Sequence, residues 1–83
     1  MLSTKKQLSD VQLWQRNLAS LIRSGLFVRA DLGESNGLHT IVGVYGDGSV
    51  SAPMAKYADF RRAEDALEII HRLVQSGHSA EVN

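Results

Sequence analysis

The sequence predicts an α+β domain in which two helices and a three-stranded antiparallel meander follow the order α-β-β-β-α. Segments near each end of the chain repeat apolar residues at helical spacing. The segment between them alternates apolar and polar residues and is interrupted by turn sequences. Because two amphipathic helices suffice to cover one face of such a sheet, we expect a two-layer sandwich with both helices on one face.

The composition limits the class of protein. A chain of 83 residues is long enough for one small domain, spanning residues 1–83. Nine basic and nine acidic side chains give no net charge, whereas binding to nucleic-acid phosphates usually needs a basic excess. The absence of cysteine excludes disulfides and thiolate metal sites and favours a cytoplasmic location. No apolar run approaches the roughly 20 residues that span a bilayer, so we expect a soluble domain without a membrane partner.

The first helix is predicted over about residues 9–24. Ser9 and Gln12 have the spacing of a capping box, and Gly25 is a natural left-handed stop. The apolar residues of one helical face are Val11, Trp14, Leu18, Leu21 and Ile22. The polar residues expected mostly on the opposite face are Gln12, Gln15, Arg16, Asn17, Arg23 and Ser24.

Two turn sequences divide the middle of the chain into strands. Asn36-Gly37 is expected to turn the chain between the first two strands. Asp47-Gly48 lies in a Gly46–Ser49 segment typical of a tight hairpin turn before the third strand, which Pro53 would end. The predicted strands are residues 26–32, 39–45 and about 49–52.

The second helix is predicted over about residues 59–76. Asp59 is the expected N-cap, and Gly77 is the expected C-terminal stop. The apolar stripe of this helix comprises Phe60, Ala63, Leu67, Ile70 and Val74.

Strand alternation predicts two sheet faces of different chemistry. The residues expected to face the helices are Leu26, Val28, Ala30, Leu32, Thr40, Val42 and Val44. The residues expected on the open face are Phe27, Arg29, Asp31, His39, Ile41, Gly43 and Tyr45. Aromatic residues and arginine are enriched at interface hot spots. The predicted partner-binding residues are therefore Phe27, Arg29, His39, Ile41 and Tyr45, with Gly43 giving a partner access to the backbone.

Two alternatives to this prediction stay open. Isolated apolar side chains are common on protein surfaces, so the open face is also consistent with ordinary exposed scatter. The assignment of faces also depends on the register, because a slip of one residue would exchange them.

Basic residues gather near the start of the second predicted helix. Lys56, Arg61 and Arg62 form this group, and the helix dipole disfavours cations at that end. A bound anion, such as a phosphate or a partner's carboxylate, would compensate for the cost. The alternative is a solvated surface in which Arg61 pairs with Asp65 and Arg72 pairs with Glu68 at i,i+4 spacing.

The predicted element order resembles that of double-stranded-RNA-binding domains, which place basic residues at the start of their last helix. Over residues 46–67, Gly46-x-Gly48 and Ala55-Lys56 are similar to parts of their motif. Ser51, Ala52 and Pro53 stand where that family carries a lysine pair. The resemblance implies RNA binding through the basic group as an alternative function.

Catalysis and metal binding are not expected. The spacing of His39, His71 and His78 is not that of metal ligands, and no serine, histidine and aspartate are spaced as a triad. We therefore predict no enzymatic activity, no metal and no cofactor. In size and style the chain resembles accessory proteins of phages and mobile elements, including anti-CRISPR-type inhibitors. The leading hypothesis is a small protein-binding module that regulates or inhibits a partner by covering its surface, and a homodimer through the open face is a further hypothesis.

Overall fold

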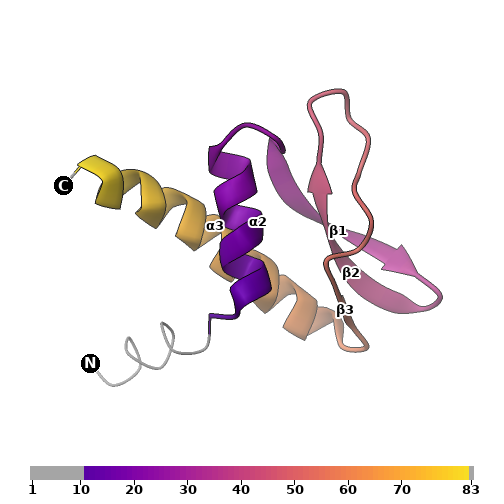
Figure 1. The fold of residues 1–83 in the computed structure, drawn as a ribbon. Coiled ribbons are helices and arrows are strands. Elements are labelled where there is room, and N and C mark those ends of the chain that lie inside the picture. The colour runs from indigo at the N-terminus through magenta and orange to yellow at the C-terminus, as the bar shows by residue number, and fades with distance from the viewer. Residues whose placement is uncertain (1–10, 83) are drawn as a thin grey trace, which may run out of the picture.

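The computed structural model describes residues 11–82 of the chain, and the side chains of residues 11–76. The elements are α2 (Leu13–Arg23), β1 (Arg29–Ser35), β2 (Leu38–Val44), β3 (Ala55–Tyr57) and α3 (Phe60–Val82). The strands form one antiparallel sheet of order β1-β2-β3. Figure 1 shows α2 and α3 crossing beside this sheet. The predicted α+β fold and its α-β-β-β-α order are confirmed.

The N-terminal end of α2 differs from the prediction. The helix begins at Leu13 with Gln12 as its N-cap, and the backbone amide of Gln12 donates to Gln15 Oε1 at 2.9 Å. The predicted capping residue Ser9 lies outside the described residues. Gln15 was expected on the polar face, but it is only 3% exposed and its Nε2 donates to the carbonyl oxygen of Ala66 in α3 at 3.3 Å. The buried side-chain amide of Gln15 is tolerated because both its oxygen and its nitrogen are hydrogen-bonded.

The C-terminal end of α2 is the predicted glycine stop. Gly25 has a φ of 94°, a conformation that side chains disfavour. Its amide donates to Ile22 O, and the amide of Leu26 donates back to Leu21 O, both at 3.1 Å. This pair of bonds is a Schellman motif, which satisfies the last carbonyl groups of the helix.

The turn between β1 and β2 is also confirmed. Asn36 and Gly37 have φ angles of 53° and 79°, as a two-residue hairpin turn with positive φ requires. Ser35 and Leu38 pair directly across it. Residues 33–35 were expected in a loop, but the tight turn lets them continue the ladder as the end of β1.

The start of β1 interrupts the alternation of side chains. The amide of Val28 donates to Val44 O at 2.7 Å, and Arg29 is the register partner of the same Val44. Two residues opposite one define a β-bulge. Consequently Val28 and Arg29 are both exposed, while Phe27 and Ala30 on either side are 3% and 2% exposed. The predictions that Val28 faces the helices and that Phe27 lies on the open face are wrong, because the bulge breaks the alternation.

The faces of β2 are the reverse of those predicted. Ala30 pairs with Gly43 and Leu32 with Ile41, and directly opposed residues lie on the same face. Ala30 and Leu32 face the helices as predicted, so Ile41 and Gly43 face them too. A two-residue turn at positions 36–37 pairs each even-numbered residue of β1 with an odd-numbered residue of β2. The prediction placed even-numbered residues of both strands together, which this turn does not allow.

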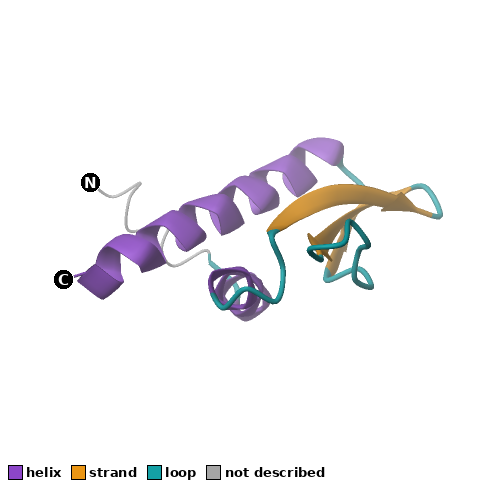
Figure 2. Ribbon diagram, turned by 90° about the horizontal axis from the view of Figure 1, so that it is seen from above, coloured by secondary structure: helices purple, strands orange, loops and turns teal. Residues whose placement is uncertain are grey.

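The core lies between the two helices and one face of the sheet. Its fully packed residues are Leu18, Phe27, Ala30, Ile41, Ala63 and Ile70. Trp14 and Leu67, from the predicted apolar stripes of the two helices, are only partly buried and pack against this core. Seen from above, α3 runs alongside the sheet, and α2 is viewed along its axis next to α3 (Figure 2). Helix α2 packs mainly on α3, and α3 contacts all three strands.

The third strand lies later in the chain than predicted. Val50 makes only an isolated bridge to Val44, and β3 begins at Ala55, after Pro53. Between them the chain stays beside β2 through Ser51, whose amide donates to Gly43 O at 2.9 Å and whose hydroxyl accepts the Gly43 amide at 3.0 Å. Proline has no amide hydrogen, so a regular ladder resumes only beyond it.

The Gly46–Ser49 turn is confirmed by its hydrogen bonds. The amide of Tyr45 donates to Ser49 O at 2.8 Å, and Gly48 has a φ of 92°. The hydroxyl and amide of Ser49 donate to the Asp47 carboxylate at 2.6 and 2.9 Å. These bonds lower the pKa of Asp47, because they stabilise its charged form.

Helix α3 begins as predicted and ends later. Asp59 Oδ1 accepts the amide of Arg61 at 3.0 Å, which confirms Asp59 as the cap. The predicted stop at Gly77 is wrong, since the helix continues to Val82. A glycine costs a helix about 1 kcal/mol relative to alanine and does not end it alone.

Candidate functional site

The helix-free face of the sheet is one functional candidate, although Thr40, Val42 and Val44 at its centre are themselves buried. Both described helices pack on the opposite face, which holds the core. The register assigns to the helix-free face Val28, Arg29, Asp31, Thr40, Val42, Val44, Val50 and Lys56. The composition of this face therefore differs from the predicted one, although Arg29 and Asp31 belong to both.

A row of three valines crosses the helix-free face. Val28 and Val50 lie on either side of Val44, joined to it by a backbone hydrogen bond and a β-bridge respectively. Val44 is 4% exposed, whereas Val28 and Val50 are 55% and 57% exposed. We call these three residues the valine row. The exposed side chains of Val28 and Val50, with Val44 between them, form a local apolar surface. Such surfaces are common at protein contact sites.

An ion pair borders the valine row. Arg29 Nε lies 3.8 Å from Asp31 Oδ2, and both side chains are more than half exposed. An exposed pair of this length contributes little to stability. Both groups are thus available to pair with charges on a partner at the edge of the apolar surface.

The predicted partner-binding residues do not form one surface. Phe27 and Ile41 belong to the core, with exposures of 3% and 0%, so their assignment to an open face is wrong. His39 lies on the helix side of the sheet, with its ring centroid 5.2 Å from that of Phe60. Tyr45 is 36% exposed at the end of the sheet, with its ring 4.9 Å from that of Phe27. Of this group, only Arg29 lies on the helix-free face.

The space above Gly43 is occupied by the protein's own side chain. A Cβ atom on Gly43 would lie 2.7 Å from three ring atoms of Phe27. The glycine therefore admits the Phe27 ring into the core and gives no partner access to the backbone, contrary to the prediction.

The basic residues are divided between two surfaces. Lys56 pairs with Thr40 on the helix-free face, while its neighbour Tyr57 points to the other side of β3. Arg61 and Arg62 are exposed in the first turn of α3, and Arg62 lines a groove beside Tyr57. Among the described residues Arg61 makes no ion pair with Asp65, although the predicted pair of Arg72 and Glu68 forms at 2.9 Å.

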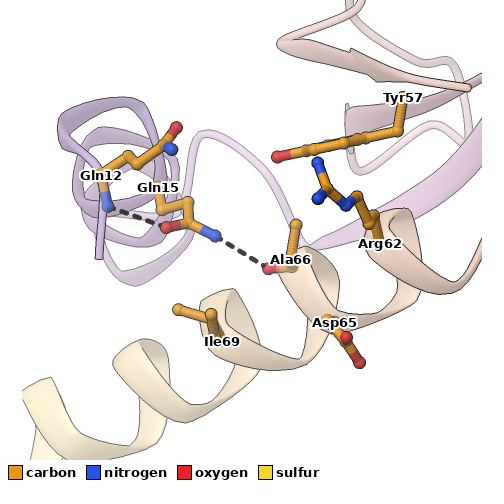
Figure 3. A pocket seen from close by; sticks show the side chains of 7 residues that line it. All are labelled: Gln12, Gln15, Tyr57, Arg62, Asp65, Ala66 and Ile69. Carbon is orange, nitrogen blue, oxygen red and sulfur yellow. Dashed lines mark hydrogen bonds between the residues drawn. The ribbon is translucent and has the colours of Figure 1, made fainter. Parts of the chain in front are cut away.

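The groove beside Tyr57 was not predicted. It has a volume of about 180 Å³, lies between the start of α2 and the first turns of α3, and is open to solvent. Figure 3 shows its lining residues, which are Gln12, Gln15, Tyr57, Arg62, Asp65, Ala66 and Ile69. They come from segments up to 57 positions apart (Gln12 to Ile69), so no local sequence pattern connects them.

Burial raises the pKa of Tyr57, and the charge of Arg62 partly opposes this shift. The phenol is therefore a hydrogen-bond donor at neutral pH. Figure 3 shows the Arg62 guanidinium beside the Tyr57 ring, so these two donors are near neighbours in the groove.

The structure gives no metal cluster within the part of the chain that it describes. There, no group of three or more histidine, cysteine, aspartate or glutamate side chains is placed to hold an ion. His71 is exposed on α3, and the side chain of His78 lies outside the described part.

Comparisons with protein-family models, with curated proteins and with solved structures found no match. Neither α2 nor α3, as far as they are described, is long and apolar enough to cross a membrane. Two surfaces of the described residues are therefore the candidates for function: the helix-free face and the groove.

Proposed function

We propose that this chain is a non-enzymatic module that binds another protein through the helix-free face of its sheet. The observation that carries the proposal is the valine row, because it presents exposed apolar side chains on a face that no described helix covers. The neighbouring Arg29 and Asp31 supply one charge of each sign. An apolar centre with a charged border is the usual anatomy of a protein interface.

We further propose that the module is a regulator or inhibitor that acts by covering a partner's surface. A rigid sheet face with exposed side chains binds without a conformational step, which suits a protein that acts by occupying a surface. The proposed partner is a different protein. The alternative partner is a second copy of this chain, and pull-down and sedimentation measurements distinguish the two. We place the module in the cytoplasm, since it has no cysteine to form stabilising disulfides.

Val50→Asp is expected to abolish partner binding and leave the fold intact. The side chain is 57% exposed, so a carboxylate there remains hydrated in the free protein but is buried and unpaired in the complex. The expected loss of affinity is at least about 100-fold, as for an unpaired charge in an interface. Pull-down with the tagged chain measures a heterologous partner, and sedimentation velocity measures self-association.

Leu13→Asp provides the matched control, since Leu13 is 73% exposed on α2, which packs on the opposite side of the sheet from the valine row. It introduces the same charge at another exposed apolar position and should leave binding unchanged. Equal losses from both variants would show that general hydrophobicity causes the association. Unchanged binding by Val50→Asp would reject the valine row as the contact.

A second candidate function is nucleic-acid binding, in line with the element order of double-stranded-RNA-binding domains. The observation that favours it is that Arg61 and Arg62 are exposed in the first turn of α3 and make no ion pair with any described residue. Exposed arginines at one helix end are suited to phosphate contacts.

The double substitution Arg61→Ala and Arg62→Ala tests this candidate. If these side chains contact phosphates, the change should weaken binding to every sequence alike and lower the salt slope by about 2. Gel-shift titrations with duplex RNA, duplex DNA and single strands at low salt measure both effects. No shift for the wild type at about 50 µM, far above the concentrations that specific complexes need, would end this candidate.

A further inference from the structure

The groove lies on the helix side of the molecule and is separate from the helix-free face. Tyr57 and Lys56 are adjacent in β3 and point to opposite sides of the sheet, with Tyr57 in the groove. A ligand in the groove would therefore not compete with a partner on the valine row.

Hydrogen-bond donors from three elements converge on this groove. Gln12 Oε1 accepts the Trp14 indole N–H at 2.6 Å, which fixes the amide orientation and leaves Nε2 as a donor. The Tyr57 hydroxyl points into the space between the helices, and the guanidinium of Arg62 lies beside the same ring (Figure 3). The start of α2 adds the positive end of a helix dipole.

The acceptors at the groove are already engaged or directed elsewhere. Gln15 Oε1 accepts the Gln12 amide, and the Ala66 carbonyl oxygen accepts Gln15 Nε2. The Asp65 carboxylate points away from the Tyr57 hydroxyl (Figure 3). The groove consequently offers donors to a ligand and few acceptors, which selects for an acceptor-rich group.

We propose that the groove binds a single carboxylate group carried on a short aliphatic stem. Arg62 supplies the only positive side chain among the described lining residues, and a guanidinium matches a carboxylate in two parallel hydrogen bonds. Asp65 is a nearby negative charge, so a monoanion is preferred over a phosphate dianion. Ala66 and Ile69 provide the apolar wall for the stem, and a volume of about 180 Å³ accommodates a few heavy atoms.

Titration with sodium butyrate at constant ionic strength tests the proposal. Trp14 is the only tryptophan in the chain and bonds directly to Gln12, so its fluorescence reports on the groove. The side-chain amide NMR signals of Gln12 and Gln15 provide a second readout. We expect saturable binding with a dissociation constant of about 1 to 30 mM, the range open to a ligand of this size.

Two substitutions and one control make the test specific. Arg62→Gln should weaken butyrate binding about tenfold or more, since it removes the positive charge and the paired N–H donors of the guanidinium. Tyr57→Phe should weaken binding about threefold to tenfold, since it removes one hydroxyl donor. Arg72→Gln removes the same charge from an exposed position on α3 outside the groove, and it should leave the affinity unchanged. Thermal melts confirm that the variants remain folded.

Inorganic phosphate at pH 8, where it is mainly a dianion, should bind more weakly than butyrate. Tighter binding of phosphate would overturn the choice of a monocarboxylate. The absence of saturable changes up to about 100 mM butyrate would overturn the site itself, because a site of the expected affinity would be largely occupied at that concentration. Equal affinity of the wild type and Arg62→Gln would overturn it too. None of these results depends on partner binding at the valine row.

Discussion

Phe27→Ala is expected to lower the free energy of unfolding by about 3–5 kcal/mol, the usual cost of removing a buried aromatic ring. The Phe27 side chain is 3% exposed and belongs to the core with Ala30 and Ile41. Urea denaturation followed by circular dichroism measures the loss. Its neighbour Val28 is 55% exposed, so Val28→Ala should change stability by no more than about 0.5 kcal/mol. Equal costs at the two positions would contradict the bulge that separates them.

The contact between Phe27 and Gly43 can be tested by combining substitutions at the two positions. A methyl group on Gly43 would overlap the ring, so Gly43→Ala should cost about 1–3 kcal/mol in the wild type. In the Phe27→Ala background the ring is absent and this cost should largely disappear. If the two costs added fully, the ring would not occupy the space above the glycine.

Ile41→Ala is expected to cost about 2–5 kcal/mol, as truncation of a fully buried branched side chain usually does. Ile41 is 0% exposed, between the helices and the sheet. A domain of this size has a total stability of about 5–15 kcal/mol, so the variant should melt many degrees lower. Val50→Ala, at an exposed position on the other face, should stay within about 0.5 kcal/mol of the wild type. An Ile41→Ala variant as stable as the wild type would instead support the predicted assignment of Ile41 to the open face.

The corrected register changes which residues are candidates for binding. Phe27 and Ile41 were attractive as contact residues because they are large and apolar, and the same properties make them core residues. Valine side chains are smaller than the aromatic side chains of the predicted patch. The proposal of binding at the valine row therefore rests on the exposure of Val28 and Val50 and not on residue type alone. Substitutions at Phe27 or Ile41 would reduce binding only by unfolding the protein.

Local sequence signals predicted both helices and the first two strands of this fold, but not the position of the third strand. Helical spacing predicted both helices, Asn36-Gly37 predicted the first hairpin, and Asp59 and Gly25 predicted a helix start and a helix end. These features depend on interactions within a few residues, such as capping bonds and positive φ angles. The register of β1 and β2 was also contained in the sequence, since a two-residue turn sets which residues are paired.

The tertiary structure alone decided which side chains are buried at the ends of these elements and where the groove lies. At the bulge, Val28 and Arg29 lie on the same face, so Phe27 lies on the face opposite to the one that alternation predicts. The sequence pattern does not indicate the bulge, because it exists only when β1 pairs with β2. Gln15 looks like a surface residue until α3 brings the Ala66 carbonyl oxygen within hydrogen-bonding distance. Both outcomes depend on contacts between distant segments, and the free energy of such contacts is set by packing and hydrogen bonding in three dimensions rather than by neighbours along the chain.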